Sequence, residues 1–307
     1  MVNGKYKILC LVGGGKFGCI PAQFLSYVSC AEKGRDMFGI DFMSGTSIGG
    51  ILAAAYAAGN SFKAVSDMFN ARAKDCFVKR WQSKISLLAC PTYKGDNLRA
   101  VIQEMIGDAT LGGVKQIYPK LSTIIPALDL THDEYLVFQN IKQNDYWDVP
   151  LIDIAQMTSA AQTYFPCVDF NGNCIIDAGV IDVTSMFTCI TAIHGKAGIP
   201  FEDMDVLMIG IGDDSNAANC DPITPKKYQS YTNVEMLLKV IVPYLTFGNK
   251  MVTTYWGKNM GFNSFTYWNP IKITGDMDDT SDIPQLTAEC DKYRYDFMKV
   301  WTHWLYD

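Results

Sequence analysis

Short apolar runs alternate with helical segments along the first part of the chain. An apolar run at residues 7–12 has the length of a buried strand, and residues 20–25 begin a helix after it. A second strand ends at residues 41–44 and precedes a helix of small residues at 48–58. Because strands that alternate with helices form largely parallel sheets covered on both faces, this order predicts a single α/β domain with a mostly parallel central sheet flanked by helices.

The turn between the second strand and its helix reads Gly45-Thr46-Ser47-Ile48-Gly49. Glycines on both sides of a serine allow a tight strand-to-helix turn that holds the hydroxyl at an exposed corner. The N–H of Ile48 and the positive end of the helix then face any oxyanion that forms beside Ser47. The motif therefore predicts Ser47 as a nucleophile, flanked by Gly45 and Gly49.

A glycine-rich loop, Gly13-Gly14-Gly15-Lys16-Phe17-Gly18, follows the first strand. Three consecutive glycines let the main chain turn its N–H groups outward at a helix N-terminus, which suits a developing negative charge. We expect Gly13, Gly14 and Gly15 to form an oxyanion hole together with Ile48, with Gly18 completing the motif.

The same loop also satisfies the dinucleotide-binding pattern G-x-G-x-x-G. That pattern requires an acidic residue about 20 positions later, at the end of the second strand. Asp36 precedes this strand and Asp41 opens it, so the fit is poor. The Walker pattern fails as well, because no Lys-Ser or Lys-Thr follows the glycines.

A third stretch, Asp177-Ala178-Gly179, lies in an apolar run at residues 174–180, which predicts a strand that ends in an acid and a small-residue turn. An aspartate in such a turn is more often a turn former or a helix cap than a base. The upstream segment at residues 158–166, which reads Thr-Ser-Ala-Ala-Gln-Thr-Tyr-Phe-Pro, changes this interpretation.

Together these segments resemble the patatin-like phospholipase family of lipid acyl hydrolases. Family members carry a Gly-Gly-Gly-x-x-Gly loop, a Gly-x-Ser-x-Gly elbow, a Thr-Ser-Ala-Ala-x-x-x-Phe-Pro helix end and an Asp-Gly-Gly or Asp-Gly-Ala motif. The matching segments, in the same order, are residues 13–18, 45–49, 158–166 and 177–179. A run at residues 206–212 is similar to the family's later strand, which ends in Gly-x-Gly.

The resemblance implies a Ser–Asp dyad. Asp177 would take the proton of Ser47 while the hydroxyl attacks an ester carbonyl, and no metal or other cofactor would be needed. Partial burial would raise the pKa of Asp177 above its ordinary value and give an acid limb of activity near pH 4 to 6. The loop departs from the family pattern at Phe17, where Arg is common, and this departure concerns phosphate recognition. Lys16, one position earlier, is the nearest cation.

Two alternatives remain open. In the first, His194 or His303 completes a Ser-Asp-His triad in the order typical of α/β-hydrolases; the remaining histidine is His132. In the second, the protein is an effector whose dyad stays silent until a partner or ligand rearranges a lid.

Composition fits one domain over residues 1–307. The chain is 49% hydrophobic and has no linker-like segment. Residues 1–190 carry the oxyanion loop, the nucleophile elbow and Asp177, whereas residues 191–307 carry the later strand, an aromatic flap and a C-terminal helix. The net charge of −6 argues against nucleic acid as a partner.

The expected partner is a lipid or phospholipid, reached by transient contact with a membrane surface. Ten cysteines without a C-x-x-C pair indicate reduced core residues, and the N-terminus lacks the pattern of a signal peptide, so we expect a cytoplasmic protein. Residues 244–268 have a loop-like, aromatic-rich composition that suits a lid or an interfacial patch, and a folded flap over the core is an equal alternative.

Overall fold

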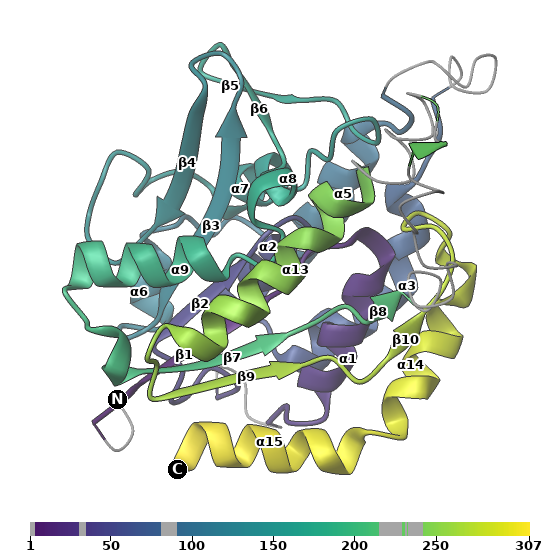
Figure 1. The fold of residues 1–307 in the computed structure, drawn as a ribbon. Coiled ribbons are helices and arrows are strands. Elements are labelled where there is room, and N and C mark those ends of the chain that lie inside the picture. The colour runs from purple at the N-terminus through teal and green to yellow at the C-terminus, as the bar shows by residue number, and fades with distance from the viewer. Residues whose placement is uncertain (1–3, 31–34, 81–90, 215–228, 231, 233–241) are drawn as a thin grey trace.

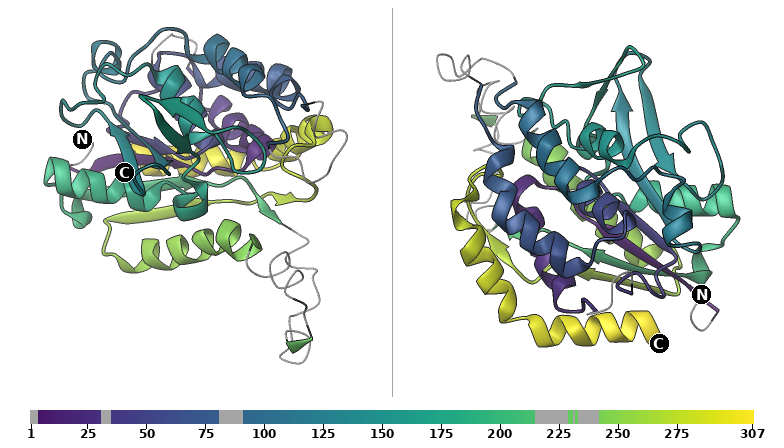
Figure 2. Two further views of the ribbon diagram at one scale, coloured as in Figure 1. Left: turned by 90° about the horizontal axis from the view of Figure 1, so that it is seen from above. Right: turned by 180° about the vertical axis from the view of Figure 1, so that it is seen from behind.

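The computed structural model describes residues 4–307 except 31–34, 81–90, 215–228, 231 and 233–241. Its described part is a three-layered α/β domain, with one central sheet between two layers of helices (Figures 1 and 2). The predicted fold class is therefore confirmed.

The central sheet contains eight of the described strands, in the order β5-β6-β3-β2-β1-β7-β9, with β4 paired to β3. A second, two-stranded ladder pairs β10 with β8. The strands are β1 (Tyr6–Leu11), β2 (Phe42–Gly45), β3 (Ser122–Asp129), β4 (Glu134–Gln139), β5 (Val168–Phe170), β6 (Asn173–Ile176), β7 (Met204–Ile209), β8 (Asp213–Asp214), β9 (Ser264–Trp268) and β10 (Lys272–Ile273).

Strands β3, β2, β1, β7 and β9 run parallel, whereas β4 and β6 are antiparallel to β3. Strand β2 pairs with the first half of β3, where Ser44 lies opposite Ile124. Strand β6 pairs with the second half, where Ile176 lies opposite Leu128, and it runs in the opposite direction. The carboxyl ends of β2 and β6 therefore approach each other beside the middle of β3.

Helices cover both faces of the sheet. In the view from above, α13 lies on one side of the sheet and α3 and α5 lie on the other (Figure 2). The helices are α1 (Cys19–Ser26), α2 (Ile48–Ala57), α3 (Phe62–Cys76), α5 (Gly95–Ile106), α6 (Val114–Ile117), α7 (Leu151–Thr158), α8 (Gly179–Asp182), α9 (Met186–Ala192), α13 (Val242–Asn259), α14 (Ile283–Asp291) and α15 (Arg294–Tyr306). Short 3₁₀ or π turns are η1 (Gly15–Gly18), η2 (Ile193–Ala197), η3 (Phe201–Asp203) and η5 (Thr280–Asp282).

Helix α2 is buried along its whole length because its small residues let it pack directly on the strands. A Cβ added to Gly49 would lie only 2.2 Å from the carbonyl oxygen of Leu11 in β1. A larger residue at this position would push the helix away from the sheet. The glycine of the predicted elbow is thus required by the contact between α2 and β1.

The aromatic-rich region forms regular structure, which fits the folded flap of the two interpretations and not the loop-like lid. Residues 242–259 form α13, and β9 then pairs in parallel with β7. The side chains of Tyr244 and Phe247 lie outside the described residues. Periodic packing against the sheet outweighs the glycine, asparagine and threonine content that suggested a loop.

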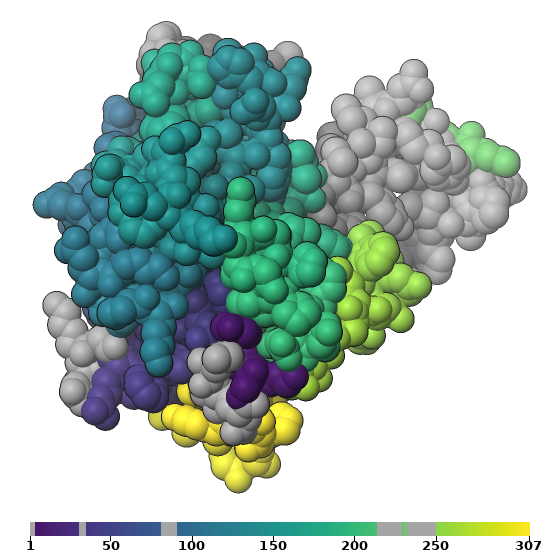
Figure 3. Space-filling model, turned by 90° about the vertical axis from the view of Figure 1, so that its left-hand side faces the viewer, coloured from purple at the N-terminus to yellow at the C-terminus, as the bar shows by residue number. Residues whose placement is uncertain are grey.

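Within the described ranges, the helices are too short or too polar to span a bilayer. Figure 3 shows the start of β1 next to the C-terminal helix at the lower end of the molecule. The C-terminal helix α15 is attached to the sheet through β7, the strand that pairs with β1. The indole N–H of Trp304 in α15 donates to the carbonyl of Asp205 in β7, 3.0 Å away.

Candidate active site

Ser47 occupies the predicted turn between β2 and α2. Its backbone has φ 57° and ψ −127°, a left-handed conformation that L-residues rarely adopt. The turn leaves Ser47 at the N-cap of α2 and places the N–H of Ile48 in the first helical turn, where it has no acceptor in its own helix. Strain of this kind is typical of residues that function fixes in place.

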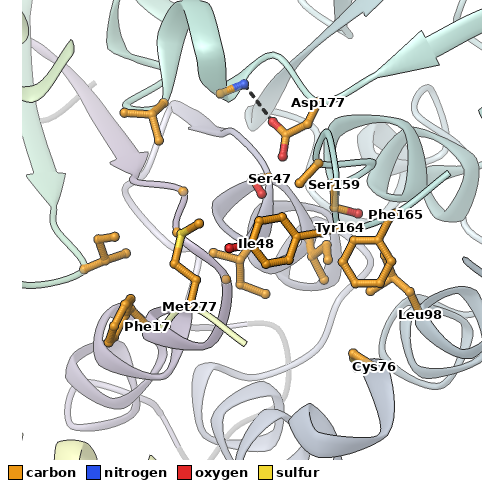
Figure 4. Close-up of a pocket in the computed structure, with 18 of the residues that line it drawn as sticks. Phe17, Ser47, Ile48, Cys76, Leu98, Ser159, Tyr164, Phe165, Asp177 and Met277 are labelled. Carbon is orange, nitrogen blue, oxygen red and sulfur yellow. Dashed lines mark hydrogen bonds between the residues drawn. The ribbon is translucent and has the colours of Figure 1, made fainter. Parts of the chain in front are cut away.

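Asp177 follows β6 and faces Ser47, because β2 and β6 end beside the same part of β3. Figure 4 shows the two side chains pointing toward each other. One carboxylate oxygen of Asp177 accepts the N–H of Gly179 at 2.7 Å. The side chain of Ser47 faces the same carboxyl group.

Burial raises the pKa of Asp177 to about 7, although the Ser47 side chain and the N–H of Gly179 oppose the rise. The side chain is only 4% exposed. The pKa of about 7 lies above the range of pH 4 to 6 expected from the sequence. The reason is that the fold encloses the aspartate more completely than its neighbours in the sequence suggest. A carboxyl group with such a pKa can exchange a proton near neutral pH.

Residues 158–166, which carry the Thr-Ser-Ala-Ala motif, hydrogen-bond to both Ser47 and Asp177. Thr158 Oγ1 accepts the N–H of Ser47 at 3.2 Å. The carbonyl of Ala160 accepts the N–H of Asp177 at 3.1 Å, and Gln162 donates to the carbonyl of Asp177 at 2.9 Å. Sequence reasoning used this segment only as a sign of the family, and the structure gives its residues a positioning role on both sides of the site.

The glycine-rich loop lies against the elbow. Gly15 has φ 57°, and Gly14 has φ 151°. Gly18 ends the loop against Ile48, since an added Cβ would lie 2.3 Å from Ile48 Cγ1. The N–H of Gly13 donates to the carbonyl of Val183 at 2.8 Å. This bond corrects the expectation for Gly13, because an amide already engaged in a short hydrogen bond has no proton to offer to an oxyanion.

Lys16 points away from the pocket. Its ammonium lies 2.8 Å from the carboxylate of Asp282, and its side chain is 1% exposed. The substitute cation for the family's loop arginine is therefore committed to an ion pair within the protein. Phe17, which stands where the patatin-like family often has Arg, contributes its ring to the pocket wall.

A pocket of about 440 Å³ opens beside Ser47 and Asp177 (Figure 4). The oxyanion-loop glycines and Ile48 form one part of its wall. An arm of the pocket extends between α3 and α5 and is almost entirely apolar. The residues of this arm are Phe69, Ala73, Cys76, Phe77, Leu98, Val101, Ile102 and Met105.

The three histidines all lie in described segments, and none of them lines this pocket. His132 bonds Asp129 at 2.9 Å, and His303 bonds Asp307 at 2.6 Å on the surface. His194 bonds the carbonyl of Ile199 at 3.0 Å and stacks on Phe201. The triad alternative therefore lacks a histidine beside Ser47.

Metal-binding clusters are not found among the described side chains, since no three His, Cys, Asp or Glu residues there converge. Among the described residues, the cysteine that lines the pocket is Cys76 in the apolar arm, and burial raises its pKa to about 12. A thiol with this pKa is protonated at neutral pH and serves as an apolar wall.

The sequence was compared with known proteins. A family model described as patatin-like phospholipase matches residues 9–186. A cGAMP-activated phospholipase from Escherichia coli (strain TW11681) is 30% identical over 253 residues, which cover 75% of this chain and 68% of that protein. The chain therefore belongs to the patatin-like phospholipase family. This membership implies lipid acyl hydrolysis as its general activity.

Two further relatives share less of their length with the chain. A cGAMP-activated phospholipase from Vibrio cholerae serotype O1 is 26% identical over 69% of this chain and 65% of its own length. Patatin-like protein 2 from Arabidopsis thaliana is 30% identical over 56% of this chain and 49% of its own length. The chain thus spans about half of one of these proteins and just under two thirds of the other.

Proposed function

We propose that the protein hydrolyses the acyl esters of phospholipids or lysophospholipids with a Ser47–Asp177 dyad. The observation that carries the proposal is that Ser47 and Asp177 face each other at the wall of a pocket whose arm between α3 and α5 is apolar. A fatty acyl chain fits an apolar arm because its burial there removes hydrocarbon from water. The ester carbonyl would then lie at Ser47.

The reaction proceeds in two steps. Asp177 accepts the hydroxyl proton of Ser47 as Oγ bonds to the ester carbonyl carbon, and the resulting oxyanion collapses to an acyl-enzyme. The leaving alcohol, a lysophospholipid or glycerophosphate group, departs with the proton from Asp177. Water then attacks the acyl carbon and gives a proton to Asp177, which returns it to Ser47 Oγ as the bond to the acyl group breaks and the fatty acid leaves.

The oxyanion donors of this proposal are the N–H groups of Gly14, Gly15 and Ile48. All three residues border the pocket beside Ser47. Each donor of this kind contributes roughly 3 kcal/mol to transition-state stabilisation. A carboxylate is a weak base for a serine hydroxyl, so the dyad depends strongly on these donors.

The proposal is tested by incubating the purified protein with diacyl and monoacyl phosphatidylcholine and measuring released fatty acid by mass spectrometry. Release that requires Ser47 supports the proposal. Hydrolysis of short soluble esters together with complete inertness toward both lipids would contradict it and would indicate a small-molecule esterase.

A ligand-regulated form of the same activity is a second candidate. Two of the relatives are named as cGAMP-activated phospholipases, and one of them is 30% identical to this chain. We expect cGAMP to raise the rate of phospholipid hydrolysis at least tenfold if this chain shares their regulation. The rate is measured with and without cGAMP, with AMP as the control nucleotide; equal rates with and without the ligand would exclude this regulation.

Membrane contact is proposed for the surface formed by α8 and α13. Its exposed apolar residues are Val180, Ile181, Met251, Val252, Tyr255 and Trp256. Val180 also lines the pocket, so the surface continues into the site. The two helices are linked where Thr184, just after α8, hydrogen-bonds Thr253 at 3.1 Å. In the view from above, α13 lies on the outside of the domain (Figure 2).

Trp256→Ala should weaken binding to phosphatidylcholine vesicles about tenfold, because a buried aromatic side chain contributes roughly 1.5–3 kcal/mol. Binding is measured by vesicle flotation, alongside hydrolysis of a short soluble ester, which should stay within twofold of wild type. Phe38→Ala is the control, since Phe38 is 77% exposed in the turn before β2. Equal flotation of the two variants would remove α13 from the contact.

A further inference from the structure

An acidic segment beyond the region matched by the family model closes one side of the pocket. Residues 275–282, here called the strap, connect β10 to α14 and include η5. Figure 4 shows Met277 of the strap next to Phe17 of the oxyanion loop. Met277 is also part of the pocket wall.

The strap contacts the backbone of the oxyanion loop directly. The N–H of Lys16 donates to the carbonyl of Met277 at 2.8 Å. A Cβ added to Gly15 would lie 2.6 Å from the same carbonyl oxygen. Two consecutive loop residues are therefore held against one strap residue, and one of the two supplies a proposed oxyanion donor.

The side chain of Lys16 forms a second link, the 2.8 Å ion pair with Asp282 at the end of the strap. Lys16 is almost fully buried, whereas the side chain of Asp282 is 28% exposed. A buried ammonium that loses its partner is strongly unfavourable, so the ion pair restricts where residue 16 can lie. The orientation of the neighbouring Gly15 N–H depends on that position.

The strap is also anchored on the opposite side of the pocket. The hydroxyl of Tyr93 donates to the carboxylate of Asp278. Tyr93 is 2% exposed and packs on Phe77 and Phe165, both of which line the pocket. The strap is thus fixed at Asp278 and at Asp282, with Met277 just before the first anchor.

We propose that the strap positions the oxyanion loop through Lys16, so that Lys16 and Asp282 are positioning residues for catalysis. This inference rests on the proposed function, because it requires that the loop N–H groups stabilise the oxyanion of a Ser47 reaction. Small displacements of such donors are costly, since a shift of about 1 Å can lower a rate roughly 10²-fold. Lys16 and Asp282 are 266 positions apart. The placement of the oxyanion donors in the loop therefore depends on a distant segment of the chain.

The test compares Asp282→Ala with Asp276→Ala, which removes a carboxylate from the same strap at an exposed position. With a short soluble ester, Asp282→Ala should lower kcat at least tenfold and leave KM within twofold. Labelling of Ser47 by a fluorophosphonate should slow by the same factor. Asp282→Glu, which retains the charge, should recover part of kcat, and Asp276→Ala should match wild type.

Several outcomes would overturn the inference. They are a kcat for Asp282→Ala equal to that of Asp276→Ala, a change confined to KM, or a lower melting temperature with normal turnover by the folded protein. If Asp282→Ala does not fold, Asp282→Asn against Asp276→Asn gives the same comparison with a smaller change in shape. Retained activity in Ser47→Ala would remove the proposed function and the inference together, whereas an inactive Ser47→Ala beside a fully active Asp282→Ala removes only the inference.

Discussion

Ser47→Ala is expected to abolish ester hydrolysis and to leave the fold intact. The substitution removes the proposed nucleophilic oxygen, and alanine fits the same turn with one atom fewer. Turnover of a short soluble ester should fall by at least 10³-fold, in line with the loss of a covalent nucleophile. Circular dichroism and the melting temperature check that the protein still folds.

The matched control for this variant is Ser159→Ala. Ser159 also lines the pocket, but its hydroxyl donates to the carbonyl of Ala155 at 2.6 Å. This variant should keep activity within about threefold of wild type. Turnover above a tenth of wild type in Ser47→Ala, or fluorophosphonate labelling at Ser159 in place of Ser47, would contradict the proposed nucleophile.

Asp177→Asn is expected to lower kcat at least 10²-fold, because an amide cannot accept the proton of Ser47. In the wild type, the base must be ionised, and burial raises the pKa of Asp177 to about 7. Activity should therefore rise with pH through about 7 and level off above it. The measurement is kcat/KM of both proteins between pH 5 and 9, and a near-normal rate in Asp177→Asn would make Asp177 a turn residue only.

The same variant should gain stability in alkaline solution. The pKa of this carboxyl is raised on folding from 3.8 to about 7, so the folded state binds the proton more tightly than the unfolded state. Stability of the wild type is therefore lost as pH rises from about 4 through 7, and the loss persists above that range. Asp177→Asn cannot ionise, so it should melt at a higher temperature than wild type at pH 8, and the difference should shrink toward pH 4.

The histidines provide the control for the dyad. Single replacements of His132, His194 and His303 by Ala should change kcat less than about tenfold, whereas a true histidine base would cost 10²-fold to 10⁴-fold. The variants are needed because a carboxyl pKa of about 7 lies next to the ordinary histidine value of about 6.5. The pH profile alone cannot distinguish the two bases.

The sequence was informative where the chemistry depends on neighbours along the chain. The elbow around Ser47 is defined by a strand, two glycines and a helix within about 15 residues, and the structure has each of these elements as expected. The fold class followed from the same alternation. The strand that precedes Asp177 was also predicted, although its pairing with the second half of β3 was not.

Contacts between distant segments could not be predicted. The ion pair of Lys16 joins residues 266 positions apart, and no local pattern indicates it. The bond from Gly13 to Val183 likewise removes a donor that the run of glycines alone suggested. The pKa of Asp177 depends on how fully the surrounding segments enclose it, which is a property of the whole fold.

The left-handed backbone of Ser47 has an evolutionary consequence. A non-glycine residue at φ 57° costs on the order of 1–3 kcal/mol, and glycine would relieve most of this strain. Selection for stability alone would therefore favour glycine at position 47, and only a need for the hydroxyl opposes that change. In a lineage that no longer required hydrolysis, mutation of the serine to glycine would spread as a stabilising change, so that the loss of activity would become hard to reverse.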